Sequence, residues 1–161
     1  MSAIIAQTTW PTVVKISPAV RHLIARNYEI ADIADPTAGN YLADEILTES
    51  GSISAPGGKV FRGHAEIRTC RERAWDGISA RHHLVHRVFV ADPEALDLLI
   101  VGSVSVTLKS GKVLDGEFTS RLVVDPDSMA SGQPRLQSVT IWADTLPLVL
   151  ALKEMNSSSR I

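Results

Sequence analysis

Four long strand-like segments follow one another in the second half of the chain, and this run limits the available folds more than any other feature. The expected strands cover residues 81–91, 97–109, 113–125 and 135–144. Residue pairs that are typical of turns, Asp-Pro and Ser-Gly, end the first three of them. Because each connection is short, neighbouring strands are expected to pair antiparallel.

The first half of the chain is mainly helical in pattern. Residues 17–33 repeat apolar side chains at the spacing of one buried helical stripe, and Ser17 provides an N-cap before a proline at the first helical position. Further helices are expected over residues 37–47, 64–75 and 146–155, with a hairpin around the Pro-Gly-Gly turn between the first two. On the helix over 64–75, the residues expected to point largely outward are Arg68, Arg71, Glu72 and Arg73.

Helices followed by a run of antiparallel strands indicate an α+β fold in which the helices pack on one face of a curved sheet. With 161 residues, 45% of them hydrophobic and 21% charged, the chain has the size and composition of one globular domain. We expect a single domain over 1–161, with its core at 17–145 and flexible ends at 1–16 and 156–161. A sheet that wraps around a long helix forms a cone, and its concave mouth favours a small-molecule pocket.

Charge and cysteine content exclude several classes of partner. The 16 basic and 18 acidic side chains leave a formal net charge of −2, so neither nucleic acid nor a membrane surface is an expected partner. The single cysteine, Cys70, excludes an internal disulfide and a zinc site built from several cysteines. A reducing compartment fits this composition.

The two ends of the sequence bear on localisation. The first residues lack a basic segment, and their apolar run is too short for a signal peptide or a membrane span, which favours a cytoplasmic protein. The C-terminal Ser-Arg-Ile at 159–161 loosely resembles the Ser-Lys-Leu peroxisomal address, so peroxisomal import is a weaker alternative.

Three histidines lie within five positions of the expected strand "SARHHLVHRVF", residues 79–89. On a regular strand, His82 and His86 share one face and His83 lies on the other. His82 and His86 would stand about 13 Å apart at about 3.3 Å per residue, so one metal ion could hardly bind both, and we expect no metal site. Histidine instead suits general acid–base chemistry, because its ordinary pKa lies near neutral pH.

The order of elements resembles the nuclear-transport-factor-2-like superfamily, which includes SnoaL-like polyketide cyclases, ketosteroid isomerase and scytalone dehydratase. Within it, the chain looks most like a fungal-type SnoaL-like group. The stretches that carry the resemblance are "YEIADIADPTAG", "GGKVFRGHAEIR", "RERAW", "SARHHLVHRVF", "VGSVSVTLKSGK", "EFTSRLVV" and "IWAD". The resemblance implies a cone-shaped sheet, a cofactor-free pocket in which side chains move protons, and a homodimer formed through the open sheet face.

The resemblance also implies site residues. It places His83 at the position of a pocket histidine, whereas a register one residue away would choose His82, with His86 on the same face. On the expected strand 113–125, Glu117 is an acid or base and Arg121 a clamp for an oxyanion or carboxylate, with Thr119 beside them; the alternative is an ion pair on the exposed face. The other implied pocket residues are Tyr28 and Asp32. Trp75 and Trp142 are expected in the core or in the pocket wall, where large rings contribute apolar area and one N–H donor.

We therefore predict a cofactor-independent isomerase or cyclase that acts on a polyketide- or terpenoid-derived intermediate. The predicted catalytic residues are His83, Glu117, Asp32 and Arg121, and the predicted substrate-binding residues are Tyr28, His82, His86, Thr119, Trp75 and Trp142. Two alternatives remain: a non-catalytic binding or dimeric assembly module, and a dehydratase of the scytalone dehydratase type. The second lacks support from the strand 97–109, which carries serines and a threonine but no histidine.

Overall fold

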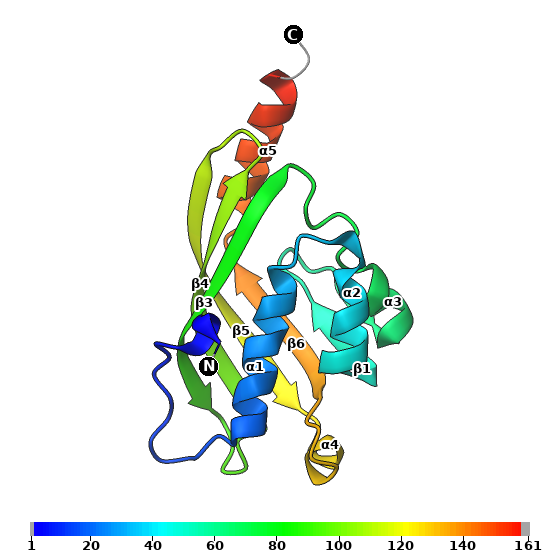
Figure 1. The fold of residues 1–161 in the computed structure, drawn as a ribbon, viewed down its shortest axis with the longest axis vertical. Coiled ribbons are helices and arrows are strands. Elements are labelled where there is room, and N and C mark those ends of the chain that lie inside the picture. The colour runs from blue at the N-terminus through cyan, green and yellow to red at the C-terminus, as the bar shows by residue number, and fades with distance from the viewer. Residues whose placement is uncertain (1, 159–161) are drawn as a thin grey trace.

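A six-stranded curved sheet forms the body of the molecule, and a long helix lies across its concave face (Figure 1). The structure is a computed structural model that describes residues 2–158. The strands are β1 (Leu47–Ser54), β2 (Val60–Arg62), β3 (Ile78–Val90), β4 (Asp97–Leu108), β5 (Val113–Val124) and β6 (Leu136–Ala143), in the spatial order β2-β1-β6-β5-β4-β3. Neighbours pair antiparallel except β1 and β6, which are parallel. The four predicted strands and the α+β fold are confirmed.

Helices precede, interrupt and follow the strands. They are η1 (Ala3–Ile5), α1 (Pro18–Ala31), η2 (Pro36–Ala38), α2 (Gly39–Tyr41), η3 (Leu42–Ile46), α3 (Gly63–Thr69), α4 (Pro126–Ala130) and α5 (Leu146–Ser158). The second predicted helix is a succession of 3-10, α and π turns over η2, α2 and η3. The third predicted helix is shorter than expected, because α3 ends at Thr69 and turns carry the chain on to β3.

Helix α1 begins and packs as its sequence predicts. The Oγ of Ser17 accepts a hydrogen bond from the backbone N–H of Val20 at 3.2 Å, and Pro18 occupies the first turn. The stripe of Val20, Leu23 and Ile24 is buried against the sheet. Each such side chain contributes about 1.5–3 kcal/mol when it leaves water, so this stripe fixes α1 on the concave face.

The main core lies between α1 and the sheet. Leu98, Ile100 and Leu122 on the concave face of β4 and β5 are fully buried, and Leu136 of β6 joins them. The side chains that alternate with them point to the convex face, where Glu117 and Arg121 are exposed. The sheet therefore has one covered face and one open face among the described residues.

Strand β3 contains a bulge that changes which side chains face inward. Its register with β4 shifts between Val85 and Arg87, so Val85 and Val88, three residues apart, are both buried. Strict alternation, which the sequence analysis assumed, puts these two valines on opposite faces and is wrong at this point. His83 therefore shares the concave face with Val85 and Val88.

The segment before α1 is packed along β3, contrary to the expectation of a flexible end. The backbone N–H of Thr9 donates to the carbonyl of His86 at 2.8 Å, and the N–H of Val88 donates to the carbonyl of Thr9 at 3.1 Å. Ile4 and Ile16 are buried in the main core. This segment covers part of an edge strand that would otherwise expose unpaired backbone groups.

The C-terminal end is helical as far as Ser158, so residues 156–158 continue α5. The Ser-Arg-Ile at 159–161, on which the peroxisomal alternative depends, lies outside the described residues. Within residues 2–158, every helix is too short or too polar to cross a membrane.

Candidate active site

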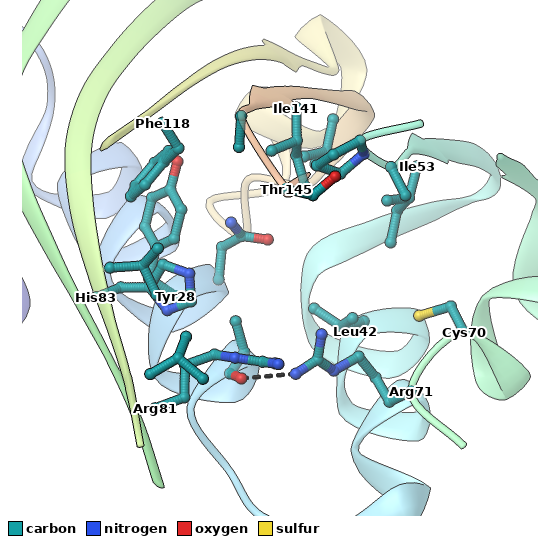
Figure 2. Close-up of a pocket in the computed structure, with 18 of the residues that line it drawn as sticks. Tyr28, Leu42, Ile53, Cys70, Arg71, Arg81, His83, Phe118, Ile141 and Thr145 are labelled. Carbon is teal, nitrogen blue, oxygen red and sulfur yellow. Dashed lines mark hydrogen bonds between the residues drawn. The ribbon is translucent and has the colours of Figure 1, made fainter. Parts of the chain in front are cut away.

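A cavity of about 290 Å³ lies at one end of the core, between α1, the concave face of the sheet and the first hairpin (Figure 2). Its lining is mainly apolar and includes Leu42, Ile53, Val104 and Ile141. This volume is close to the lower end of the range for small-molecule sites. A few polar groups enter this apolar space, and they come from α1, from the turn after α3, from β3 and, at Thr145, from the segment after β6.

His83 and Asp32 form a hydrogen-bonded pair at the wall of the pocket. One carboxylate oxygen of Asp32 lies 2.5 Å from Nδ1 of His83, and the other accepts the backbone N–H of His83 at 2.8 Å. The two side chains are only 15% and 14% exposed. Two bonds from one carboxylate fix the imidazole and favour the tautomer with its proton on Nδ1. Nε2, which has no protein partner within residues 2–158, is then the basic nitrogen.

Two aromatic rings hold the imidazole in place. The ring of His83 lies 5.6 Å from that of Tyr28 and 5.5 Å from that of Phe118, the second contact being edge-on. The hydroxyl of Tyr28 and the Oγ of Ser120 are 2.5 Å apart in a fully buried hydrogen bond. Burial raises the pKa of Tyr28 well above its ordinary value, so the phenol stays neutral. Ser120 and Phe118 were not predicted as site residues.

Two arginines also line the pocket, and the sequence analysis missed both. Arg71 follows the end of α3, and Arg81 precedes His83 by two residues on β3. The prediction that Arg71 points outward assumed a helix up to residue 75 and is wrong, because α3 ends at Thr69. Strand alternation from His83 could have identified Arg81, since residues i and i+2 share a face.

The other two histidines of β3, His82 and His86, lie outside the pocket, which corrects their predicted role in substrate binding. His82 is exposed on the convex side, with Nδ1 3.9 Å from Asp32. His86 is exposed too, and its Nε2 lies 2.9 Å from the Oγ of Ser103. The register that favours His83 over His82 is the one the structure contains.

The predicted site residues of strand β5 face away from the pocket. Phe118, Ser120 and Leu122 point inward, so Glu117, Thr119 and Arg121 point to the convex face. Arg121 donates two hydrogen bonds to Asp97, at 2.8 and 2.6 Å. This is the exposed ion pair that was the alternative, and it keeps both charges in water, where they need no ligand. We therefore withdraw pocket roles for all three.

Neither predicted tryptophan lines the pocket. Trp142 is 52% exposed on the convex face, in register with Thr119. Trp75 packs in a second, smaller cluster with Ile78 and Leu108, where its Nε1 is buried and has no hydrogen-bond partner in the part of the chain that the structure describes. Within residues 2–158, the structure has no group of three or more His, Cys, Asp or Glu residues arranged to hold a metal ion.

Comparisons with known proteins identify the fold. No family model matches the sequence, and no curated protein matches it. A candidate SnoaL-like polyketide cyclase from Jannaschia sp. matches with a TM-score of 0.63 and 12% identity, over 86% of this chain and 96% of that chain. A nuclear-transport-factor-2-like protein of unknown function from Burkholderia pseudomallei matches with a TM-score of 0.62 and 15% identity, over 83% and 96%.

A third solved structure, a protein with a ketosteroid-isomerase-like fold from Catenulispora acidiphila in complex with trimethylamine, has a TM-score of 0.58 at 12% identity, over 78% of this chain and 85% of that one. None of these comparisons supports the narrower resemblance to a fungal-type group. At such identities the likeness concerns the fold and leaves activity open. The chain has the α+β fold of the nuclear-transport-factor-2-like and SnoaL-like proteins.

Proposed function

We propose that this protein is a cofactor-independent isomerase or cyclase for a polyketide- or terpenoid-derived intermediate, with His83 as its general acid and base. The observation that carries the proposal is the His83–Asp32 pair at the wall of an apolar pocket. An oriented imidazole backed by a carboxylate is a recurring arrangement for proton transfer. The likeness in fold to candidate polyketide cyclases supports the substrate class.

In this mechanism, Nε2 of His83 removes a proton from the carbon next to a substrate carbonyl. The electron pair of the broken C–H bond forms an enolate, and Asp32 stabilises the imidazolium that results. For an isomerisation, the imidazolium returns the proton to a different carbon. For a cyclisation, the enolate carbon first attacks a second carbonyl, and the imidazolium then protonates the new alkoxide. Neither reaction changes the mass of the substrate.

The test is turnover of poly-β-ketone and enone intermediates in deuterated water, followed by mass spectrometry and chiral chromatography. We expect wild-type protein to give products that lose no water, with solvent deuterium at carbon after an isomerisation and a new carbon–carbon bond with deuterium on the new hydroxyl after a cyclisation. His83→Gln should lower the rate at least about 100-fold, the usual range for a general acid–base group. His82→Gln is the matched control, because His82 is the exposed neighbour, and it should keep its rate. Full activity of His83→Gln would refute the proposal, and loss of water would indicate the dehydratase alternative.

We also propose that the protein is a homodimer through the convex face of the sheet. The resemblance implies this arrangement, and the face carries exposed apolar side chains, among them Leu84, Leu99 and Trp142, which are 37%, 39% and 52% exposed. Apolar side chains that gather on an otherwise polar surface are typical of protein interfaces. The exposed histidines His82 and His86 lie on the same face.

A further inference from the structure

Two guanidinium groups meet in the pocket. Arg71 and Arg81 reach in from opposite walls, one from the turn after α3 and one from β3, and their ends point toward each other (Figure 2). Both side chains are largely withdrawn from water. Two like charges at close range in a desolvated space are unfavourable unless something negative lies between them.

Within residues 2–158, neither of these two cations has a salt bridge. Arg71 donates from Nη2 to the carbonyl of Ala31 at 2.7 Å, and Arg81 donates from Nη2 to the carbonyl of Ala74 at 2.8 Å. The Nε of Arg71 is buried and has no hydrogen-bond partner among the described residues. A guanidinium has five N–H donors, so most of the hydrogen-bonding capacity of the pair is free for a ligand.

Four other arginines have a carboxylate partner: Arg26 with Glu45 at 2.7 Å, Arg68 with Asp44 at 2.6 Å, Arg73 with Asp76 at 2.9 Å and Arg121 with Asp97 at 2.6 Å. Arg21, whose Nε is also buried without a partner among the described residues, lies over the ring of Trp10 at 4.4 Å. Arg71 and Arg81 need a counterion more than the four paired arginines do, because they are more buried, and yet they have none.

The charges around the pocket do not balance without a ligand. None of the residues that line it is an aspartate or glutamate. The nearest carboxylate, Asp32, acts on both arginines through its charge, but both of its oxygens already accept hydrogen bonds from His83. Burial lowers the pKa of Arg71, and it lowers that of Arg81 to about 10. Two guanidinium cations thus face the single carboxylate of Asp32, and one further negative charge would balance this set.

We propose that the substrate of this pocket is a carboxylic acid whose carboxylate binds between Arg71 and Arg81. The inference rests on the proposed function for the identity of the pocket as a substrate site, and it names the substrate class. A planar carboxylate matches the fork of a guanidinium, so a pair of forks can hold both of its oxygens. The apolar body of the acid packs against Val104, Val106 and Ile141.

The position of the clamp relative to His83 fits this substrate class. Arg81 and His83 are two residues apart on one strand, and their Cα atoms are therefore about 6.6 Å apart at about 3.3 Å per residue. When the substrate carboxylate binds Arg81, substrate carbons a few bonds from that carboxylate lie within reach of Nε2 of His83. The clamp orients the acid, and the imidazole acts on its ring-forming or isomerising portion.

Two probes of equal shape and different charge test the proposal without knowledge of the natural substrate. Binding of 2-naphthoate and of its neutral isostere 2-naphthamide is measured by isothermal titration calorimetry at pH 7.5, where the carboxylic acid is ionised. We expect wild-type protein to bind naphthoate at least about 10-fold more tightly than naphthamide, the value of one good charge-assisted hydrogen bond. Equal binding of the two probes, or binding of neither, would overturn the proposal.

Variants then assign the preference to the clamp. Arg71→Gln and Arg81→Gln should each remove most of the preference for naphthoate while leaving naphthamide binding unchanged. Arg73→Gln, which alters an exposed arginine two residues from Arg71, is the matched control and should keep the full preference. A preference for naphthoate that survives in both Arg71→Gln and Arg81→Gln would refute the assignment. If either variant fails to fold, the comparison of the two probes on wild-type protein still decides the question.

The binding test separates this inference from the proposed function. His83→Gln should bind naphthoate as wild-type protein does, because the imidazole is not part of the clamp. If His83→Gln keeps full turnover while the preference for naphthoate holds, the acid–base proposal fails and the clamp stands. If turnover depends on His83 but the two probes bind equally, the clamp fails and the acid–base proposal stands.

Discussion

Replacing Asp32 with asparagine should change the tautomer of His83 and lower the stability of the fold, and the two effects can be measured separately. The carboxylate accepts from Nδ1 of His83 at 2.5 Å and from its backbone N–H at 2.8 Å, and both bonds need acceptor oxygens. An amide has one acceptor oxygen and one donor NH₂. Whichever way the amide turns, one of the two partners of Asp32 meets a donor instead of an acceptor.

The favoured orientation keeps the amide oxygen on the backbone N–H of His83, because a backbone N–H can only donate a hydrogen bond. The NH₂ group then donates to Nδ1, so the proton of His83 moves to Nε2, the nitrogen that should act as the base. Loss of one charge-assisted hydrogen bond should lower the free energy of unfolding by about 1.5–3 kcal/mol. The wrong tautomer deprives the site of its base, so kcat should fall about as far as in His83→Gln, at least about 100-fold.

The tautomer can be measured without substrate. In ¹⁵N–¹H correlation spectra of imidazole-labelled protein, Nδ1 of His83 should carry the proton in the wild type and Nε2 in Asp32→Asn. Unfolding in urea gives the stability change, and turnover gives the kinetic change. Asp97→Asn is the control, since it alters an exposed carboxylate paired with Arg121. An unchanged tautomer together with an unchanged rate would refute the role assigned to Asp32.

Two further predictions concern the buried phenol and the convex face. Because burial raises the pKa of folded Tyr28, an unfolded tyrosine releases its proton at about pH 10 while the folded one keeps it. Stability from this residue is therefore complete below pH 10 and falls by about 1.4 kcal/mol per pH unit above it. The free energy of unfolding of the wild type minus that of Tyr28→Phe, from urea titrations at pH 8 to 11, should show this slope; a constant difference would contradict it. On the convex face, Leu99→Glu should convert the dimer to a monomer in light scattering, whereas Glu117→Gln on the same face should not; a wild-type monomer would contradict the dimer.

Local sequence signals predict those parts of the fold that depend on neighbouring residues. The cap at Ser17 and the apolar stripe of α1 are complete within one segment, and so are the four long strands with their turn residues. His83 was predicted because its neighbourhood resembles a strand that carries a pocket histidine in related folds. Asp32 was predicted from the same resemblance, and its place one helical turn after Tyr28 agrees with a shared cavity.

Alternation in "GEFTSRLVV" puts the apolar Phe118 and Leu122 on one face and the polar Glu117, Thr119 and Arg121 on the other, and the apolar face is the one that points inward. The pocket roles predicted on β5 came from the resemblance, and they are wrong because the polar face is the open one.

The remaining site depends on features that a single segment does not encode. The bulge in β3 reverses the inward face between Val85 and Val88, and it forms where Thr9, distant in sequence, pairs with the strand. Arg71 points inward because α3 ends at Thr69, and helix ends are the least predictable boundaries.

The C-terminal end of α1 explains why the polar groups of the pocket gather in one place. The last carbonyls of a helix lack partners within the helix and carry partial negative charge, so they attract donors and cations. The carbonyl of Ala31 accepts from Arg71, and the next residue, Asp32, accepts from both donors of His83. One helix end thus positions a clamp residue and the base together. A shift of this end would therefore disturb the His83–Asp32 pair and anion binding at once, whereas a change at Arg81 alone should weaken anion binding and leave the His83–Asp32 pair intact.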